Sequence, residues 1–121
     1  MYGVPSDLPL SGFVGAECNQ IALGQFQIQF HFAGTGSILA ESGWELRNSV
    51  GEVIDRSCAH GDRECYRVHG IIDVQVARYV IDPPRSFTLY FQTGHALTIF
   101  DDSEHYECFS LHLIDGDVIV V

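Results

Sequence analysis

The feature that most constrains this chain is a strict alternation of apolar and polar side chains in QFQIQFHF, residues 25–32. Phenylalanine or isoleucine occupies every second position, and glutamine or histidine occupies the positions between. Successive side chains of a β-strand point to opposite faces of the sheet, so a period of two predicts a strand with one buried face.

The same alternation recurs in SFTLYF (86–91) and, after the glycine-containing turn QTGH, in ALTIF (96–100). Sliding the chain by 61 positions superposes the two halves, with Phe26 on Phe87, Ile28 on Leu89, Phe30 on Phe91, Ile38 on Ile99 and Glu41 on Asp102. Each half then reads as two strands joined by a turn. Two-hairpin duplication is one interpretation; the other is that all hairpins share this pattern by construction.

Further short apolar segments separated by glycine turns bring the expected number of strands to about ten. This predicts a mainly β (α+β) fold, an antiparallel β-sandwich or small barrel built from meandering hairpins. The predicted core consists of Phe26, Ile28, Phe30, Phe32, Ile38, Phe87, Leu89, Phe91, Leu97, Ile99, Phe109, Leu111 and Leu113.

Two segments depart from the strand pattern. GDRECYRVHGII (61–72) has Cys65, Val68 and Ile72 at helical spacing, which predicts one short helix. Residues 1–12 contain two prolines and are expected to form an extended lead-in. The length of 121 residues fits one domain spanning the whole chain.

The charge is one-sided, because sixteen carboxylates face six arginines and the chain has no lysine, giving a formal charge of −10. Such a surface repels nucleic acid and attracts a basic protein partner. No segment has the length of a membrane span or the pattern of a secretory signal, so we expect a cytoplasmic protein without membrane contact. We therefore expect the four cysteines to be free thiols.

An acidic stretch lies between two apolar runs in TIFDDSEHYECFSLHL, residues 98–113. Its carboxylates suggest a calcium loop or a pair of catalytic acids. A calcium loop of the EF-hand type needs a central glycine, and none lies between Gly94 and Gly116. The alternating flanks favour the tip of a hairpin. If this tip is functional, its carboxylates favour a negatively charged contact surface over a reaction centre.

A second group with chemical potential is formed by Cys58, His60, Cys65 and His69. Two thiolates and two imidazoles are a possible zinc set, and the last pair has the C-x3-H interval. The first pair has the interval C-x-H rather than C-x2-C, so the pattern is a weak zinc signal. We expect no cofactor. Nucleophile elbows, phosphate loops and dinucleotide fingerprints are absent, which lowers the expectation of an enzyme.

The chain resembles a family of small, mostly β bacterial proteins through FVGAECNQIALGQFQIQFHF, WELR and the segment from FTLYFQTGHALTIFDDSEHYECFSLHL to DVIVV. The most specific part is the phrase from Gly94 to Phe109. The resemblance implies a cytosolic β domain and, for some similar acidic domains, an immunity protein that neutralises a toxin by binding it. It supplies no catalytic residues.

We therefore predict a non-enzymatic acidic binding module. Its specific version is an immunity protein that neutralises a basic toxin. The predicted partner-binding residues are Asp101, Asp102, Glu104, Glu107, Glu41, Trp44 and Tyr106. Two alternatives remain open at this point: a β domain that binds a small ligand or a metal, and a structural subunit of a homo-oligomer.

Overall fold

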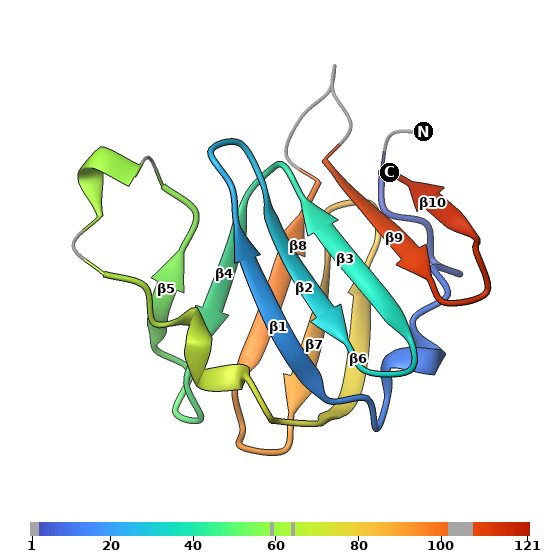
Figure 1. Ribbon diagram of the computed structural model, residues 1–121, viewed down its shortest axis with the longest axis horizontal. Helices are drawn as coiled ribbons and strands as arrows, with labels where there is room; N and C mark the ends of the chain where they lie inside the picture. Colours follow the sequence, from blue (N-terminus) through green and yellow to red (C-terminus); the bar gives the residue numbers. More distant parts are fainter. Residues whose placement is uncertain (1–2, 59, 64, 102–107) are drawn as a thin grey trace.

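The computed structural model describes residues 3–58, 60–63, 65–101 and 108–121, and within them the chain forms two antiparallel sheets packed face to face (Figure 1). The predicted antiparallel β-sandwich is confirmed. Each sheet ends in edge strands on both sides, so the described strands form no closed barrel. No helix in the described ranges is long and apolar enough to cross a membrane.

The first sheet lies in front in Figure 1 and has the strand order β1-β2-β3-β9-β10. Its strands are β1 (Cys18–Leu23), β2 (Ile28–Phe32), β3 (Gly36–Ala40), β9 (Phe109–Leu113) and β10 (Val118–Val120). The second sheet lies behind it and has the order β5-β4-β8-β7-β6. Its strands are β4 (Trp44–Arg47), β5 (Val53–Arg56), β6 (Val76–Asp82), β7 (Ser86–Phe91) and β8 (Ala96–Phe100).

These two orders show a repeat in the topology. Each half of the chain forms a three-stranded meander, β1-β2-β3 or β6-β7-β8, and then crosses over to add a hairpin to the other half's sheet. Exchanging β1 to β5 with β6 to β10 converts the first order into the second. The two halves of the sandwich are thus interlocked.

The register fixes the offset of this repeat. Phe30 pairs with Ile38 in one meander and Leu89 pairs with Leu97 in the other, which places the second meander 59 positions after the first (89 minus 30, 97 minus 38). The offset of 61 predicted from the sequence is therefore two residues larger than the offset of 59 in the structure. A shift of two keeps every side chain on the same face, so the alternation in the sequence fits both offsets.

The core lies between the sheets, where the inward faces of the central strands meet. Edge-to-face ring contacts cross the interior between Phe30 and Trp44, with centroids 6.2 Å apart, and between Phe87 and Phe109, 5.0 Å apart. Eleven of the thirteen predicted core residues are buried, Leu113 is partly buried, and Phe26 is wrong because its side chain is 80% exposed. Its position in the β1–β2 turn removes it from the alternating face.

The N-terminal segment is part of the core rather than only a lead-in. It ends in a 3-10 turn, η1 (Ser11–Phe13), and contributes four side chains with at most 3% exposure. These are Val4, Leu8, Leu10 and Phe13. Beyond it, the backbone N–H of Gly15 donates to the carbonyl oxygen of Val76 at 2.7 Å, which ties the segment to β6.

The predicted helix over 61–72 is wrong. The described part of this stretch contains two 3-10 turns, η2 (His60–Asp62) and η3 (Val68–Ile71). The carboxylate of Asp55 on β5 accepts hydrogen bonds from the backbone N–H groups of Arg67 and Val68, at 2.7 and 2.9 Å. An α-helix would need these donors for its own i to i−4 bonds, so a tertiary contact replaces the helix.

The interpretation of the acidic stretch as a hairpin tip is also wrong. β8 pairs with β4 and β7 in the second sheet, whereas β9 pairs with β3 and β10 in the first. The stretch between them connects the two sheets. In the repeat it corresponds to Glu41–Gly43, the connection from β3 to β4.

Candidate functional site

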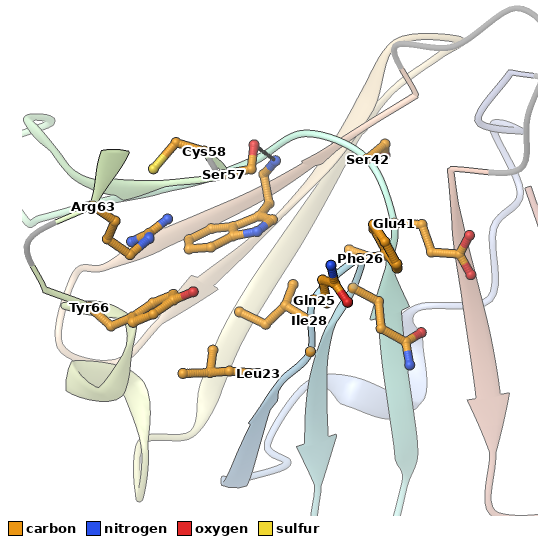
Figure 2. A pocket seen from close by; sticks show the side chains of 14 residues that line it. Leu23, Gln25, Phe26, Ile28, Glu41, Ser42, Ser57, Cys58, Arg63 and Tyr66 are labelled. Atoms are coloured by element: carbon orange, nitrogen blue, oxygen red, sulfur yellow. Dashed lines mark hydrogen bonds between the residues drawn. The ribbon is translucent and has the colours of Figure 1, made fainter. Parts of the chain in front are cut away.

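A pocket of about 280 Å³ opens at one end of the sandwich, beside the β1–β2 turn (Figure 2). Its wall is built from that turn, the end of β3, the start of β4 and the segment after β5. Figure 2 shows Arg63 and Tyr66 on one side of the pocket and Glu41 on the other. Ligand pockets span roughly 300–1,000 Å³, so this one is at the small end and suits a few side chains.

Exposed apolar side chains form part of the pocket's rim. Phe26 is 80% exposed and Leu23 is 49% exposed, whereas Trp44 is only 6% exposed. The backbone N–H of Gly24 donates to the carbonyl oxygen of Gln27 at 2.8 Å, which closes a two-residue turn and holds Phe26 at its tip. Large aromatic side chains exposed beside a pocket are more typical of surfaces that bind a partner than of the rest of a domain's solvent-exposed surface.

The pocket wall also contains a buried cation. The guanidinium of Arg63 lies 4.0 Å from the ring centroid of Tyr66 and 5.7 Å from that of Trp44. It forms an ion pair with Asp55. The side chain of Arg63 is 7% exposed and that of Asp55 is 4% exposed. This pairing and the two ring contacts hold Arg63 in place and stiffen the segment after β5.

Asp55 is held as a carboxylate in this setting. Burial by itself raises its pKa, but the hydrogen bond from Arg63 and those from the backbone N–H groups of Arg67, Arg56 and Val68 outweigh burial and lower the pKa below its ordinary value. The ionised side chain therefore acts as a structural clamp between β5 and the pocket wall.

The hydroxyl groups of the pocket are engaged by backbone. Ser42 Oγ lies 2.7 Å from the carbonyl oxygen of Phe100 and 3.0 Å from that of Cys108. Ser57 Oγ accepts a hydrogen bond from the backbone N–H of Trp44 at 3.2 Å. These contacts hold both hydroxyl groups against backbone atoms of neighbouring strands and crossovers.

The structure brings two of the predicted partner-binding residues to this pocket. Glu41 is exposed at its rim and Trp44 lies in its wall. The carboxylate of Asp101 is turned to the protein itself, because it accepts hydrogen bonds from the backbone N–H of Gly3 and from the thiol of Cys108, the latter at 3.0 Å. Four predicted residues, Asp102, Glu104, Tyr106 and Glu107, lie outside the described residues, and their role stays a prediction.

The candidate zinc residues lie on the segment after β5. Cys58, Cys65 and His69 are exposed, and the side chain of His60 is outside the described set. The described residues contain no group of three or more histidine, cysteine, aspartate or glutamate side chains placed to hold a metal ion. All four cysteines carry thiols rather than disulfides, and burial raises the pKa of Cys18 to about 11.

Sequence reasoning missed Phe26 as a surface residue, and it missed Asp55, Arg63 and Tyr66 entirely. The glycine before Gln25 was an available signal for Phe26, because a turn there ends the alternating strand at Ile28. Nothing local marks Asp55 and Arg63 as partners, since the two are joined only when the chain folds back on β5.

No family model, curated protein or solved structure matches the chain. The resemblance to small bacterial immunity-type domains therefore stays a prediction.

Proposed function

We propose that this chain is a non-enzymatic acidic binding module that contacts a basic protein partner through the pocket beside the β1–β2 turn. The observation that carries the proposal is the exposed Phe26 at the tip of this turn, next to Leu23 and a pocket walled by Trp44. An aromatic side chain with this exposure loses water only when a partner covers it.

The charge of the chain defines the sign of the partner. The formal charge is −10, and Glu41 presents a carboxylate at the rim. None of the three ion pairs among the described residues involves Glu41. A partner with lysine or arginine around an apolar centre matches this surface, and attraction between unlike charges speeds its association. Neutralising a basic toxin is the form of this function that fits the predicted immunity-type resemblance.

The test is a display library of protein fragments from the genome that encodes the chain, selected on the immobilised protein. Binders are expected to be basic, and Phe26→Ser and Glu41→Lys should each raise Kd about tenfold, which is about 1.4 kcal/mol. Raising the salt concentration should weaken the complex.

The controls are variants of matched exposure outside the pocket. Val50 is 74% exposed and Glu52 is exposed, and both lie in the β4–β5 turn. Val50→Ser and Glu52→Lys should leave Kd unchanged. If no fragment binds, or if the pocket and control variants weaken binding equally, the proposed function is wrong.

A further inference from the structure

The topological repeat extends to the hydrogen bonds around the crossovers. The backbone N–H of Glu41 donates to the carbonyl oxygen of Cys108 at 2.8 Å, and that of Phe100 donates to Gly43 at 2.9 Å. Glu41 and Phe100 are 59 positions apart and hold equivalent places after β3 and within β8, as Gly43 and Cys108 do before β4 and β9. The two ends of the crossovers are therefore built alike.

In the second half, the place beside the meander's first turn is filled by the chain itself. The backbone N–H of Val4 donates to the carbonyl oxygen of Pro84, in the β6–β7 turn, at 2.9 Å. The preceding N–H, that of Gly3, donates to the carboxylate of Asp101 at the end of β8. Val4 is only 2% exposed there, so an apolar side chain and its backbone are bound between a turn and a crossover.

The equivalent place in the first half is the pocket. Subtracting 59 from Pro84 and Asp101 gives Gln25 and Ser42, and both line the pocket. The N-terminal segment is bound beside the β6–β7 turn, whereas the equivalent place beside the β1–β2 turn is an open pocket. Figure 1 shows these turns toward the same end of the sandwich, with the N-terminal segment near β10.

We infer that the pocket binds a linear peptide segment of a partner protein, with an aliphatic side chain inserted and an adjacent lysine or arginine facing Glu41. This inference rests on the proposed function and names the form of the partner. The seated Val4 shows that the equivalent place accepts an aliphatic residue with its backbone, and the exposed Leu23 and Phe26 give such a residue apolar contacts.

The segment comes from another protein rather than from a second copy of this chain. The chain's own candidate, the run from Gly3 to Leu10, is already bound in the second half, with Val4, Leu8 and Leu10 at most 3% exposed. Releasing it would expose these apolar side chains to water, which is unfavourable. A basic residue in the partner segment also suits the −10 charge of this chain, which repels a copy of itself.

The test uses the full chain and a phage-displayed library of random linear nonapeptides. Selected peptides are expected to share an aliphatic residue next to arginine or lysine. Synthetic peptides of the recovered sequences should change the emission of Trp44, which is the single tryptophan of the chain and lies in the pocket wall. Replacing the aliphatic residue of a peptide by serine should raise Kd about tenfold.

Variants locate the binding site. Leu23→Ser, Phe26→Ser and Glu41→Lys should each raise Kd for the peptide about tenfold, and the controls Ile114→Ser and Glu52→Lys should leave it within about twofold. Ile114 is 73% exposed and lies after β9, away from the pocket lining. Amide chemical shifts in the folded variants verify that each keeps the native structure.

The outcomes separate this inference from the proposed function. If protein fragments bind and the pocket variants weaken that binding, but linear peptides do not bind, the peptide inference is wrong and the binding function stands. If peptides bind but respond equally to pocket and control variants, the pocket is not their site and the inference is again wrong. If neither fragments nor peptides bind, both proposals fail.

Discussion

Asp55 and Arg63 form a buried ion pair at the wall of the pocket, and their surroundings explain why it is tolerated. One oxygen of Asp55 accepts hydrogen bonds from Arg63 and from the N–H of Arg56, and the other accepts from the N–H groups of Arg67 and Val68. Four donors replace the lost water, so the charge is compensated. The pair fixes where the segment after β5 runs, and with it one wall of the pocket.

Removing this carboxylate should destabilise the protein strongly. Asp55→Ala leaves Arg63 buried without its partner, so the free energy of unfolding should fall by about 3–5 kcal/mol. Urea unfolding followed by Trp44 fluorescence measures the change. The control is Asp82→Ala, which breaks the exposed pair with Arg85, whose side chain is 72% exposed, and should lower the free energy of unfolding far less than Asp55→Ala does. Equal losses in the two variants would show that the buried clamp has no special role.

The same residue gives a pH dependence. Because the folded pKa of Asp55 lies below its ordinary value of 3.8, the unfolded chain takes up the proton at a higher pH than the folded chain. The contribution is therefore complete above the ordinary value and is lost as the pH falls through it toward the folded pKa. Urea unfolding of wild type and Asp55→Asn should show a stability gap that narrows below about pH 4. A gap that stays constant down to pH 2 would contradict this.

At the scale of elements, the β1–β2 and β6–β7 turns hold equivalent places in the repeat but have different neighbours. The segment before β1 covers one end of the core beside the β6–β7 turn, whereas the end beside the β1–β2 turn is left as a pocket. A piece of chain without strand or α-helix thus has the packing role of a core element.

Truncating a core side chain of this segment should therefore be costly. Leu10 is 0% exposed, and Leu10→Ala should lower the free energy of unfolding by about 2–5 kcal/mol. Leu23→Ala, at a position that is 49% exposed on β1, is the matched control and should cost well under half of that. Thermal or urea unfolding gives both values, and a Leu10→Ala protein as stable as wild type would mean that the segment only lies against the core.

At the scale of the whole molecule, the two halves are joined by exchanged hairpins. Pairing of β3 with β9 and of β8 with β4 crosses between the halves in both sheets. The β3–β9 contact is close at Gly36, where an added Cβ would clash with the carbonyl oxygen of His112. This contact belongs to one of the two ladders that hold the halves together.

Gly34 in the β2–β3 turn and Gly36 at the start of β3 test the importance of that ladder. Gly34 and Gly36 both have positive φ, 72° and 147°, but an added Cβ at Gly34 meets nothing within 4 Å. Gly34→Ala should cost about 1–2 kcal/mol from the backbone alone. Gly36→Ala should cost clearly more, because the new methyl group pushes β9 away. Urea unfolding of both variants decides, and equal costs would mean that β3 and β9 separate without loss.

The sequence by itself determined the strands, the burial of their alternating faces and the acidic charge, because a period of two and a residue count are local properties. Only the tertiary structure decided the rest. The alternation cannot distinguish offsets of 59 and 61, because both keep each side chain on its face. The expected helix was replaced when Asp55 took the N–H groups of Arg67 and Val68. The pocket beside Phe26 likewise arises from segments distant in sequence, and no local pattern encodes which of two similar places the N-terminal segment fills.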